Sequence, residues 1–189
     1  AANPLELSDA GRTVALSGRI DRIDEMRVGS KSLIVIIDYK TGRAAFNKHE
    51  FDLGRALQLP VYCLAACELI LADRDTVPIG AGYWQLREGG FQHRKMLQPY
   101  AWDGSRAAIT NEWEDCRSRL PQIVCSLVEG LQTGQFPVFN SDADCTGRCP
   151  RSTLCRINTI RALEKQWTLP VIPAESQQSP KTGRGNRAR

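Results

Sequence analysis

The stretch Leu33-Ile34-Val35-Ile36-Ile37-Asp38-Tyr39-Lys40-Thr41-Gly42 decides how the rest of the sequence is interpreted. Its five consecutive Leu, Ile and Val residues predict a strand covered on both faces, because a half-exposed strand shows polar residues at every second position. Such a strand belongs in the middle of a sheet. Since successive side chains alternate, Asp38 and Lys40 share one face and Tyr39 points to the other. This spacing predicts a carboxylate and an ammonium about 7 Å apart at the mouth of the sheet.

A further acidic segment, Gly18-Arg19-Ile20-Asp21-Arg22-Ile23-Asp24, precedes the central strand. Polar and apolar residues alternate from Val14 onward. This pattern predicts a strand that has one solvent-exposed face and ends at Asp21. If that strand pairs with the central one, Asp21 and Asp38 can converge on one hard cation, because Mg²⁺ takes one or two carboxylates with phosphate oxygens and waters. Lys40 would then orient a water or stabilise charge on a phosphate.

The remaining pattern predicts a hairpin, two further strands and three helices around the central strand. The hairpin covers 4–21, the strands cover 79–86 and 91–97, and the helices cover 53–72, 103–134 and 157–167. Residues 43–52 are expected to be a polar connector. Pro60 would kink the first helix or mark its first turns, and Pro121 would break the second. These elements together predict an α/β fold with a mixed central sheet flanked by helices.

Composition places the chain among ordinary globular domains. It has 189 residues, 42% hydrophobic and 24% charged, and no run approaches the roughly 18 apolar residues of a membrane span. No secretory signal is visible, so for its seven cysteines we expect a reducing, cytoplasmic compartment without default disulfides. The chain begins with Ala1 rather than Met, and we expect it to be a piece of a longer protein.

The positive charge is concentrated at the C-terminal end. Residues 173–189 carry four basic side chains against one acidic side chain, which accounts for three of the four net positive charges. This stretch is rich in Ser, Gln, Pro, Gly and Arg, which predicts a disordered basic tail. Because the rest of the chain is almost neutral, any binding of nucleic acid must come from a local groove.

Three cysteines lie close together in the segment 144–156. Cys145, Cys149 and Cys155 have the spacing C-x3-C-x5-C, and three thiolates so close can wrap one soft metal centre. Zinc ions and iron–sulfur clusters are as a rule bound by four protein ligands, and this segment supplies three. Iron–sulfur, structural zinc and unliganded thiols therefore remain open from the spacing alone.

The ordered motifs GRIDRID, IDYKTG and LQLPVY resemble the PD-(D/E)xK nuclease superfamily, specifically the RecB-like and AddB-like nuclease domains. The resemblance implies a restriction-endonuclease-like core over residues 1–172, whose upstream helix is missing here. It implies metal-dependent hydrolysis of DNA, as an exonuclease acting in repair and recombination. DNA and a helicase domain or subunit are the implied partners, with no membrane.

The resemblance also implies roles for particular residues. Asp21, Asp38 and Lys40 match the catalytic positions, and Asp21, Asp38 and the backbone carbonyl of Tyr39 match the ligands of Mg²⁺ or Mn²⁺. We prefer Asp21 to Asp24 because Asp21 follows the motif's Gly18-x-Ile20, and we expect Asp24 to be solvated or paired with an arginine. Gln58 and Tyr62, four residues apart on a helix, share a face and are expected to contact DNA, unless Gln58 caps backbone and Tyr62 packs in the core.

The segment 144–156 resembles the iron–sulfur staple of AddB-type nucleases. In those proteins a first cysteine lies upstream of the nuclease core, so the fourth ligand of a 4Fe-4S cluster is expected before Ala1. The first spacing here departs from the more usual C-x2-C. The role of such a cluster would be structural, because it would pin the C-terminal segment in place.

Other residues are expected to have structural roles. His49 and His93 are expected at the surface, because neither stands where RecB-like domains carry a His or Glu metal ligand. Cys63 and Cys67 are expected to pack in the core, and Cys116 and Cys125, nine residues apart, to lie on opposite faces of a helix. The competing functions are a non-catalytic DNA-binding or scaffold module and a zinc-ribbon-like interaction module.

Overall fold

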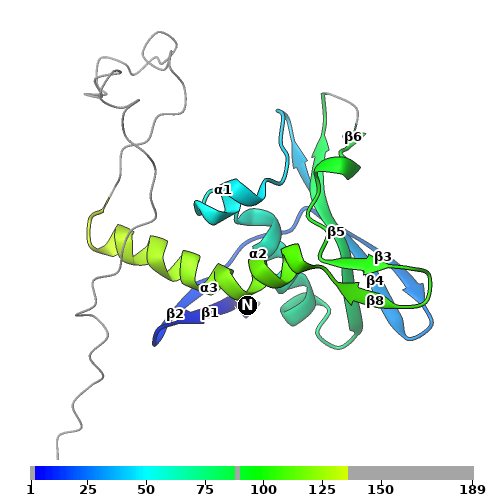
Figure 1. The fold of residues 1–189 in the computed structure, drawn as a ribbon, viewed down its shortest axis with the longest axis horizontal. Coiled ribbons are helices and arrows are strands. Elements are labelled where there is room, and N and C mark those ends of the chain that lie inside the picture. The colour runs from blue at the N-terminus through cyan, green and yellow to red at the C-terminus, as the bar shows by residue number, and fades with distance from the viewer. Residues whose placement is uncertain (1–2, 88–89, 136–189) are drawn as a thin grey trace, which may run out of the picture.

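A mixed four-stranded sheet is the centre of the computed structural model, which describes residues 3–87 and 90–135 (Figure 1). Its strand order is β3-β4-β5-β6, and two separate hairpins, β1-β2 and β7-β8, complete the described strands. The elements in chain order are β1 (Leu5–Asp9), β2 (Arg12–Leu16), β3 (Arg22–Val28), β4 (Lys31–Lys40), α1 (Lys48–Asp52), α2 (Gln58–Ala65), the π-helix η1 (Ala66–Ile70), β5 (Asp75–Gln85), β6 (Gly90–Phe91), the 3-10 helix η2 (His93–Lys95), β7 (Tyr100–Trp102), β8 (Ala107–Ile109) and α3 (Asn111–Gln132).

β4 is the interior strand that its apolar run predicts. It pairs antiparallel with β3 and parallel with β5. Ile34 and Ile36 are fully buried on one face, and Ile37 is buried on the other. Because both faces of this part of β4 are covered, its side chains are apolar at every position. The prediction of an α/β fold with a mixed sheet and flanking helices is confirmed.

β1 and β2 form the predicted N-terminal hairpin. Ala10 and Gly11 at its turn have φ of 48° and 79°, as a two-residue turn between antiparallel strands requires. The strand predicted to run on to Asp21 ends at Leu16, since Leu16 pairs with Leu5 at the very start of β1 and has no partner beyond it. That part of the prediction is wrong.

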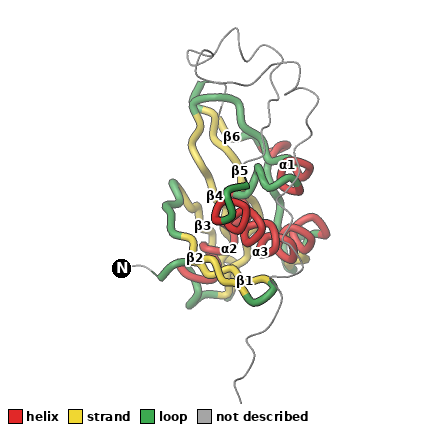
Figure 2. Tube along the Cα trace, turned by 90° about the vertical axis from the view of Figure 1, so that its left-hand side faces the viewer, coloured by secondary structure: helices red, strands yellow, loops and turns green. Residues whose placement is uncertain are grey.

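The helices gather on one side of the sheet (Figure 2). α2 packs against β4 and β5, and α3 lies across α2 and the hairpin. The core between these elements is apolar. Its largest fully buried side chains are Ile34, Ile36, Phe51, Leu59, Leu97, Leu120 and Ile123.

The helix predicted over 53–72 is shorter and begins later. Gly54 has φ of 73°, a conformation outside a helix, and α2 starts only at Gln58. Pro60 is the third residue of α2, where the missing amide breaks no helical hydrogen bond, so the prediction of a first-turn proline is confirmed. After Ala65 the chain continues as η1.

The helix predicted over 103–134 begins at Asn111. Thr110 caps it, and its hydroxyl oxygen accepts a hydrogen bond from the amide of Trp113 at 3.2 Å. Pro121 lies inside the helix without ending it, so the predicted break is wrong. The buried side chain of Leu120 beside it shows why, because packing of this face outweighs one lost hydrogen bond.

Two further boundaries differ from the sequence predictions. β5 begins at Asp75 rather than at 79, and of the strand predicted over 91–97 only Gly90–Phe91 pairs with β5 as a strand. The turn η2 interrupts it before Leu97 returns to form a single bridge with Ala81. The predicted polar connector 43–52 contains the short helix α1, whose Phe51 is fully buried.

The predicted cysteine segment 144–156, the helix predicted over 157–167 and the tail 173–189 lie outside the described residues. Cys145, Cys149 and Cys155 belong to this part of the chain. None of the helices in residues 3–87 and 90–135 is both long and apolar enough to cross a bilayer.

Candidate active site

Asp38, at the C-terminal end of β4, is buried with 3% of its surface exposed. Its Oδ1 accepts a hydrogen bond from Gln58 Nε2 at 2.8 Å, and its Oδ2 lies 2.6 Å from Lys40 Nζ. In the described part of the chain no donor is aligned with Oδ2 as in a hydrogen bond. A buried carboxylate whose partners are one amide and one ammonium still has lone pairs that a cation could use, which is typical of a functional site.

Lys40 lies on the same face of β4 as Asp38, as the alternation predicts. Its Nζ also donates to Gln58 Oε1 at 3.0 Å and lies 5.4 Å from the ring centre of Tyr83. The predicted separation of about 7 Å between the two charges is wrong, because it is the spacing of the two backbone positions. The long lysine side chain closes that gap and forms an ion pair.

Asp21 directly precedes β3, the antiparallel neighbour of β4, rather than ending the preceding strand. Arg22 pairs with Ile37, so Asp21 comes one residue before this pairing begins, at the end of β4 that carries Asp38. Asp21 Oδ2 accepts a hydrogen bond from the backbone amide of Tyr39 at 3.0 Å. The structure therefore brings both predicted carboxylates to one end of the central strand pair.

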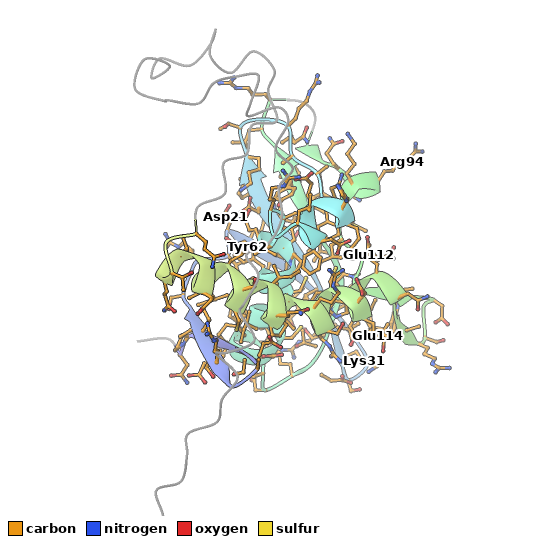
Figure 3. All side chains as sticks on the ribbon, turned by 60° about the vertical axis from the view of Figure 1, so that its left-hand side comes forward. Asp21, Lys31, Tyr62, Arg94, Glu112 and Glu114 are labelled. Atoms are coloured by element: carbon orange, nitrogen blue, oxygen red, sulfur yellow. The ribbon has the colours of Figure 1, made fainter. Side chains whose placement is uncertain are left out.

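Gln58 and Tyr62 project together from the first turns of α2. Gln58 Nε2 donates to Tyr62 Oη at 3.0 Å as well as to Asp38, so the amide bridges the helix and the strand. Gln58 therefore does not act as a backbone cap. Tyr62 and Ile20 line one groove of about 830 Å³, which places the phenol on the same side as the segment that carries Asp21 (Figure 3).

Tyr83 is a residue of this site that the sequence analysis missed. It lies on β5 directly beside Asp38 in the parallel pairing, and 8% of its surface is exposed. Burial, followed by the negative charge of Asp38, raises the pKa of Tyr83 to about 12. Only the register of β4 with β5 identifies this neighbour, because nothing in the local sequence marks it.

Asp24 is bound to an arginine, as predicted. Arg22 donates to its two carboxylate oxygens, from Nε at 2.6 Å and from a terminal nitrogen at 2.8 Å. These hydrogen bonds and the charge of Asp24 raise the pKa of Arg22. Asp24 lies on the face of β3 opposite to Asp21, since the two residues are three apart.

The two histidines of the described part lie at the surface and its four cysteines lie in or against the core, as expected. His49 and His93 are exposed. Cys63 is fully buried, and burial raises the pKa of its thiol well above its ordinary value and that of Cys67 to about 11. Cys116 and Cys125 are buried too; Cys125 Sγ donates to the carbonyl of Leu7 at 3.9 Å, and burial raises the pKa of Cys116 to about 12.

The donor set at the end of β4 suits a hard cation. Two carboxylates converge there, and one oxygen of Asp38 lacks an aligned donor. Within residues 3–87 and 90–135 no three His, Cys, Asp or Glu side chains are grouped to hold a metal ion. Mg²⁺ typically takes one or two carboxylates and completes its shell with water and substrate oxygens.

Several curated proteins resemble this chain, and each is described as a subunit of an ATP-dependent helicase/deoxyribonuclease. The protein from Latilactobacillus sakei is 32% identical over 185 residues, which cover 82% of this chain and 14% of the relative. The proteins from Lachnoclostridium phytofermentans and Clostridium tetani are each 38% identical over 42% and 49% of this chain, and 7% and 8% of their own lengths. The chain thus spans a small part of these relatives.

A family model matches most of the chain. The matched residues are 2–156, and the family is the PD-(D/E)XK nuclease superfamily. The match includes both strands that carry the acidic residues, the helix that carries Gln58 and the three clustered cysteines. The chain belongs to the PD-(D/E)XK nuclease superfamily.

Proposed function

We propose that this nuclease domain hydrolyses phosphodiester bonds of DNA with Mg²⁺ or Mn²⁺ held by Asp21, Asp38 and the backbone carbonyl of Tyr39. The observation that carries the proposal is the convergence of two carboxylates from adjacent strands beside one lysine. Such a cation supplies Lewis-acid polarisation of the scissile phosphate and acidification of a water. The burial of the Asp38 carboxylate beside Lys40 supports this assignment.

The position of Tyr39 supports its carbonyl as a ligand. The amide and the carbonyl of one strand residue point to the same side, and the amide of Tyr39 donates to Asp21. Its carbonyl is therefore directed toward the space beyond the start of β3, where the carboxylates meet. The side chain of Tyr39 takes no part, because it lies on the other face of the sheet.

Lys40 would stabilise negative charge on the phosphate or orient the attacking water. Its ammonium already has a second partner in Gln58 Oε1, so it can leave Asp38 without losing every hydrogen bond. Gln58 and Tyr62 would orient the DNA strand, since they form a rigid pair next to the two carboxylates. In this proposal Gln58 has two roles: it positions Lys40 and Asp38 by hydrogen bonds, and it contacts the DNA strand.

The names of the relatives support DNA as the substrate and a helicase as partner. They are subunits of helicase/deoxyribonucleases, and the present chain spans at most 14% of the three relatives compared. We infer an exonuclease that acts beside an ATP-dependent helicase in repair or recombination. A cytoplasmic location stays a prediction from the cysteine content.

Cys145, Cys149 and Cys155 would hold a 4Fe-4S cluster together with a cysteine upstream of this chain. The spacing and the resemblance to AddB-type nucleases support this proposal. Absorbance near 400 nm and iron content of the longer protein would test it, and colourless protein that contains zinc would contradict it.

The test of the nuclease is a double variant, Asp38→Ala/Lys40→Ala. It should lose Mg²⁺-dependent release of labelled nucleotides from DNA while it keeps the wild-type circular dichroism. Asp75→Ala is the matched control, because this carboxylate pairs with Lys31 at the opposite end of β4. A double variant that cuts as fast as wild type refutes the catalytic assignment, and a wild-type protein that cuts no DNA with Mg²⁺ or Mn²⁺ favours the scaffold alternative.

A further inference from the structure

The sheet face opposite the carboxylates carries an aromatic groove at the same end of β4. Trp84 lines this groove, and Tyr39 lies beside it on the same sheet face, with the two ring centroids 6.4 Å apart. Trp84 pairs directly with Phe91 across β5 and β6, so the two rings share this face. Trp84 and Phe91 both line a groove of about 1020 Å³. His93 lines it too, and its ring meets the ring of Phe91 edge-on with the centroids 5.0 Å apart.

Glycines give this groove its shape. A Cβ added at Gly82 would lie 2.8 Å from the ring of Phe91, so only glycine lets that ring lie on the sheet. A Cβ at Gly80 would come within 3.1 Å of Met96. Gly90, with φ of 83°, turns the chain under the indole of Trp84. The position of the aromatic rings is therefore built into β5 and the turn that follows it.

A basic groove of about 450 Å³ adjoins the aromatic one. Arg43 and Lys95 line it, and Gln85 lines both grooves. The groove is held together by two bonds to the loop after β4: Gln85 Nε2 donates to Ala44 O at 2.8 Å, and Phe46 N donates to Lys95 O at 3.0 Å. Arg94, on η2, extends outward beside it (Figure 3).

The charge of the two grooves favours a polyanion. Asp24 is the only carboxylate among the described residues that line them, and it is engaged by Arg22. The guanidinium carbon of Arg22 lies 6.0 Å from the ring centre of Trp84. Cations beside partly exposed aromatic rings are the combination that binds single-stranded nucleic acid, since bases stack on the rings and phosphates follow the basic groove. A duplex keeps its base faces covered.

We propose that the aromatic groove and the basic groove together bind an unpaired DNA strand that continues from the carboxylates over the end of the sheet. The inference rests on the proposed function for its ligand. Tyr39 makes the connection, because its backbone faces Asp21 while its ring faces Trp84. The strand would thus contact both faces of β4 around one end.

The experiment measures binding of a labelled oligonucleotide of about 20 nucleotides by fluorescence anisotropy, in EDTA so that no cleavage occurs. Trp84→Ala should raise Kd for the single strand about tenfold, and Trp84→Phe should restore most of the affinity. Binding of the matching duplex should change less than about twofold. Met26→Ala is the control, because Met26 is 57% exposed on the same sheet face but outside both grooves.

A second variant does not disturb the packed rings. Arg94→Gln/Lys95→Gln changes two exposed side chains, and it should lower the slope of log K against log salt by about 1.4, or about 0.7 for each lost phosphate contact. A Trp84→Ala protein that keeps its fold and its single-strand affinity overturns the inference. So does an equal loss of duplex affinity, or a wild-type chain that binds no single strand.

The outcomes also separate this inference from the proposed function. If wild type cleaves DNA but its single-strand binding does not depend on Trp84, the strand-binding inference is refuted and the nuclease proposal stands. If binding depends on Trp84 but the protein cleaves no DNA with Mg²⁺ or Mn²⁺, the nuclease proposal is refuted and the strand-binding inference stands.

Discussion

The two ends of β4 carry similar charged side chains in different states. At the N-terminal end Lys31 pairs with Asp75 at 2.8 Å, and Glu25 is bound by Ser32 and Arg74. The hydrogen bond from Ser32, with the charge of Arg74, lowers the pKa of Glu25. At the C-terminal end Asp38 is buried, its lysine is close, and one of its oxygens still lacks an aligned donor.

The difference teaches that residue type alone does not make a site on this sheet. An exposed ion pair such as Lys31–Asp75 replaces hydration of the two charges with their mutual attraction, so it adds little to the free energy of unfolding. A buried carboxylate can regain its lost hydration only from partners placed around it, and a divalent cation is a stronger partner than one ammonium. The C-terminal end is therefore ready to bind a cation, whereas the N-terminal end is saturated.

The largest difference between the two ends of β4 should appear when one acidic side chain is removed from each end. Asp21→Ala should lower the rate of Mg²⁺-dependent DNA cleavage by about 10³-fold, which corresponds to about 4 kcal/mol of transition-state stabilisation. Asp75→Ala should leave the rate within about twofold of wild type. Nucleotide release at saturating Mg²⁺ measures both. Equal losses in the two variants would show that the ends do not differ in function.

Cation binding without turnover sharpens the comparison next. Mg²⁺ at about 100 times its Kd should stabilise the wild-type chain by about 2.7 kcal/mol, seen as a rise of several degrees in Tm. Asp38→Asn should abolish this rise, while Glu25→Gln should keep it. A rise that survives in Asp38→Asn places the cation elsewhere.

Tyr83 extends the comparison to pH. Its pKa is raised from 10 to about 12, so the stability that its neutral form contributes is present below pH 10 and is lost as the pH rises toward 12. The free energy of unfolding should fall between pH 8 and pH 11 by about 1 kcal/mol more in wild type than in Tyr83→Phe. Urea unfolding at the two pH values measures this, and parallel losses would contradict the raised pKa.

The smallest effect is expected at the saturated end. Lys31→Ala removes an ion pair whose carboxylate partner is about half exposed, so the free energy of unfolding should fall by about 0 to 1 kcal/mol and less in high salt. A loss above about 2 kcal/mol would show that this pair is worth as much as a buried one.

Local patterns predicted the parts of the site that depend on one element. The face shared by Asp38 and Lys40 follows from strand alternation, and the contact of Gln58 with Tyr62 follows from the helical repeat. The interior position of β4 follows from its unbroken apolar run. Each of these features involves residues at most four positions apart.

Features that depend on pairing between distant segments escaped the sequence analysis. Asp21 directly precedes β3 rather than ending β2, because β2 stops at Leu16 where β1 has no further residue to pair with. Tyr83 is a neighbour of Asp38 only through the parallel register of β4 with β5. The interruption of the predicted 91–97 strand by η2 likewise depends on how Met96 and Phe91 pack on glycines of β5.

The bond from the Tyr39 amide to Asp21 means that the two acids are positioned by different kinds of contact. It fastens Asp21 to the main chain of the strand that carries Asp38, whereas the Asp38 carboxylate is held by the side-chain amide of Gln58 on α2. A shift of β3 against β4 would therefore change the distance between the two acids. A shift of α2 would change only how the Asp38 carboxylate is held.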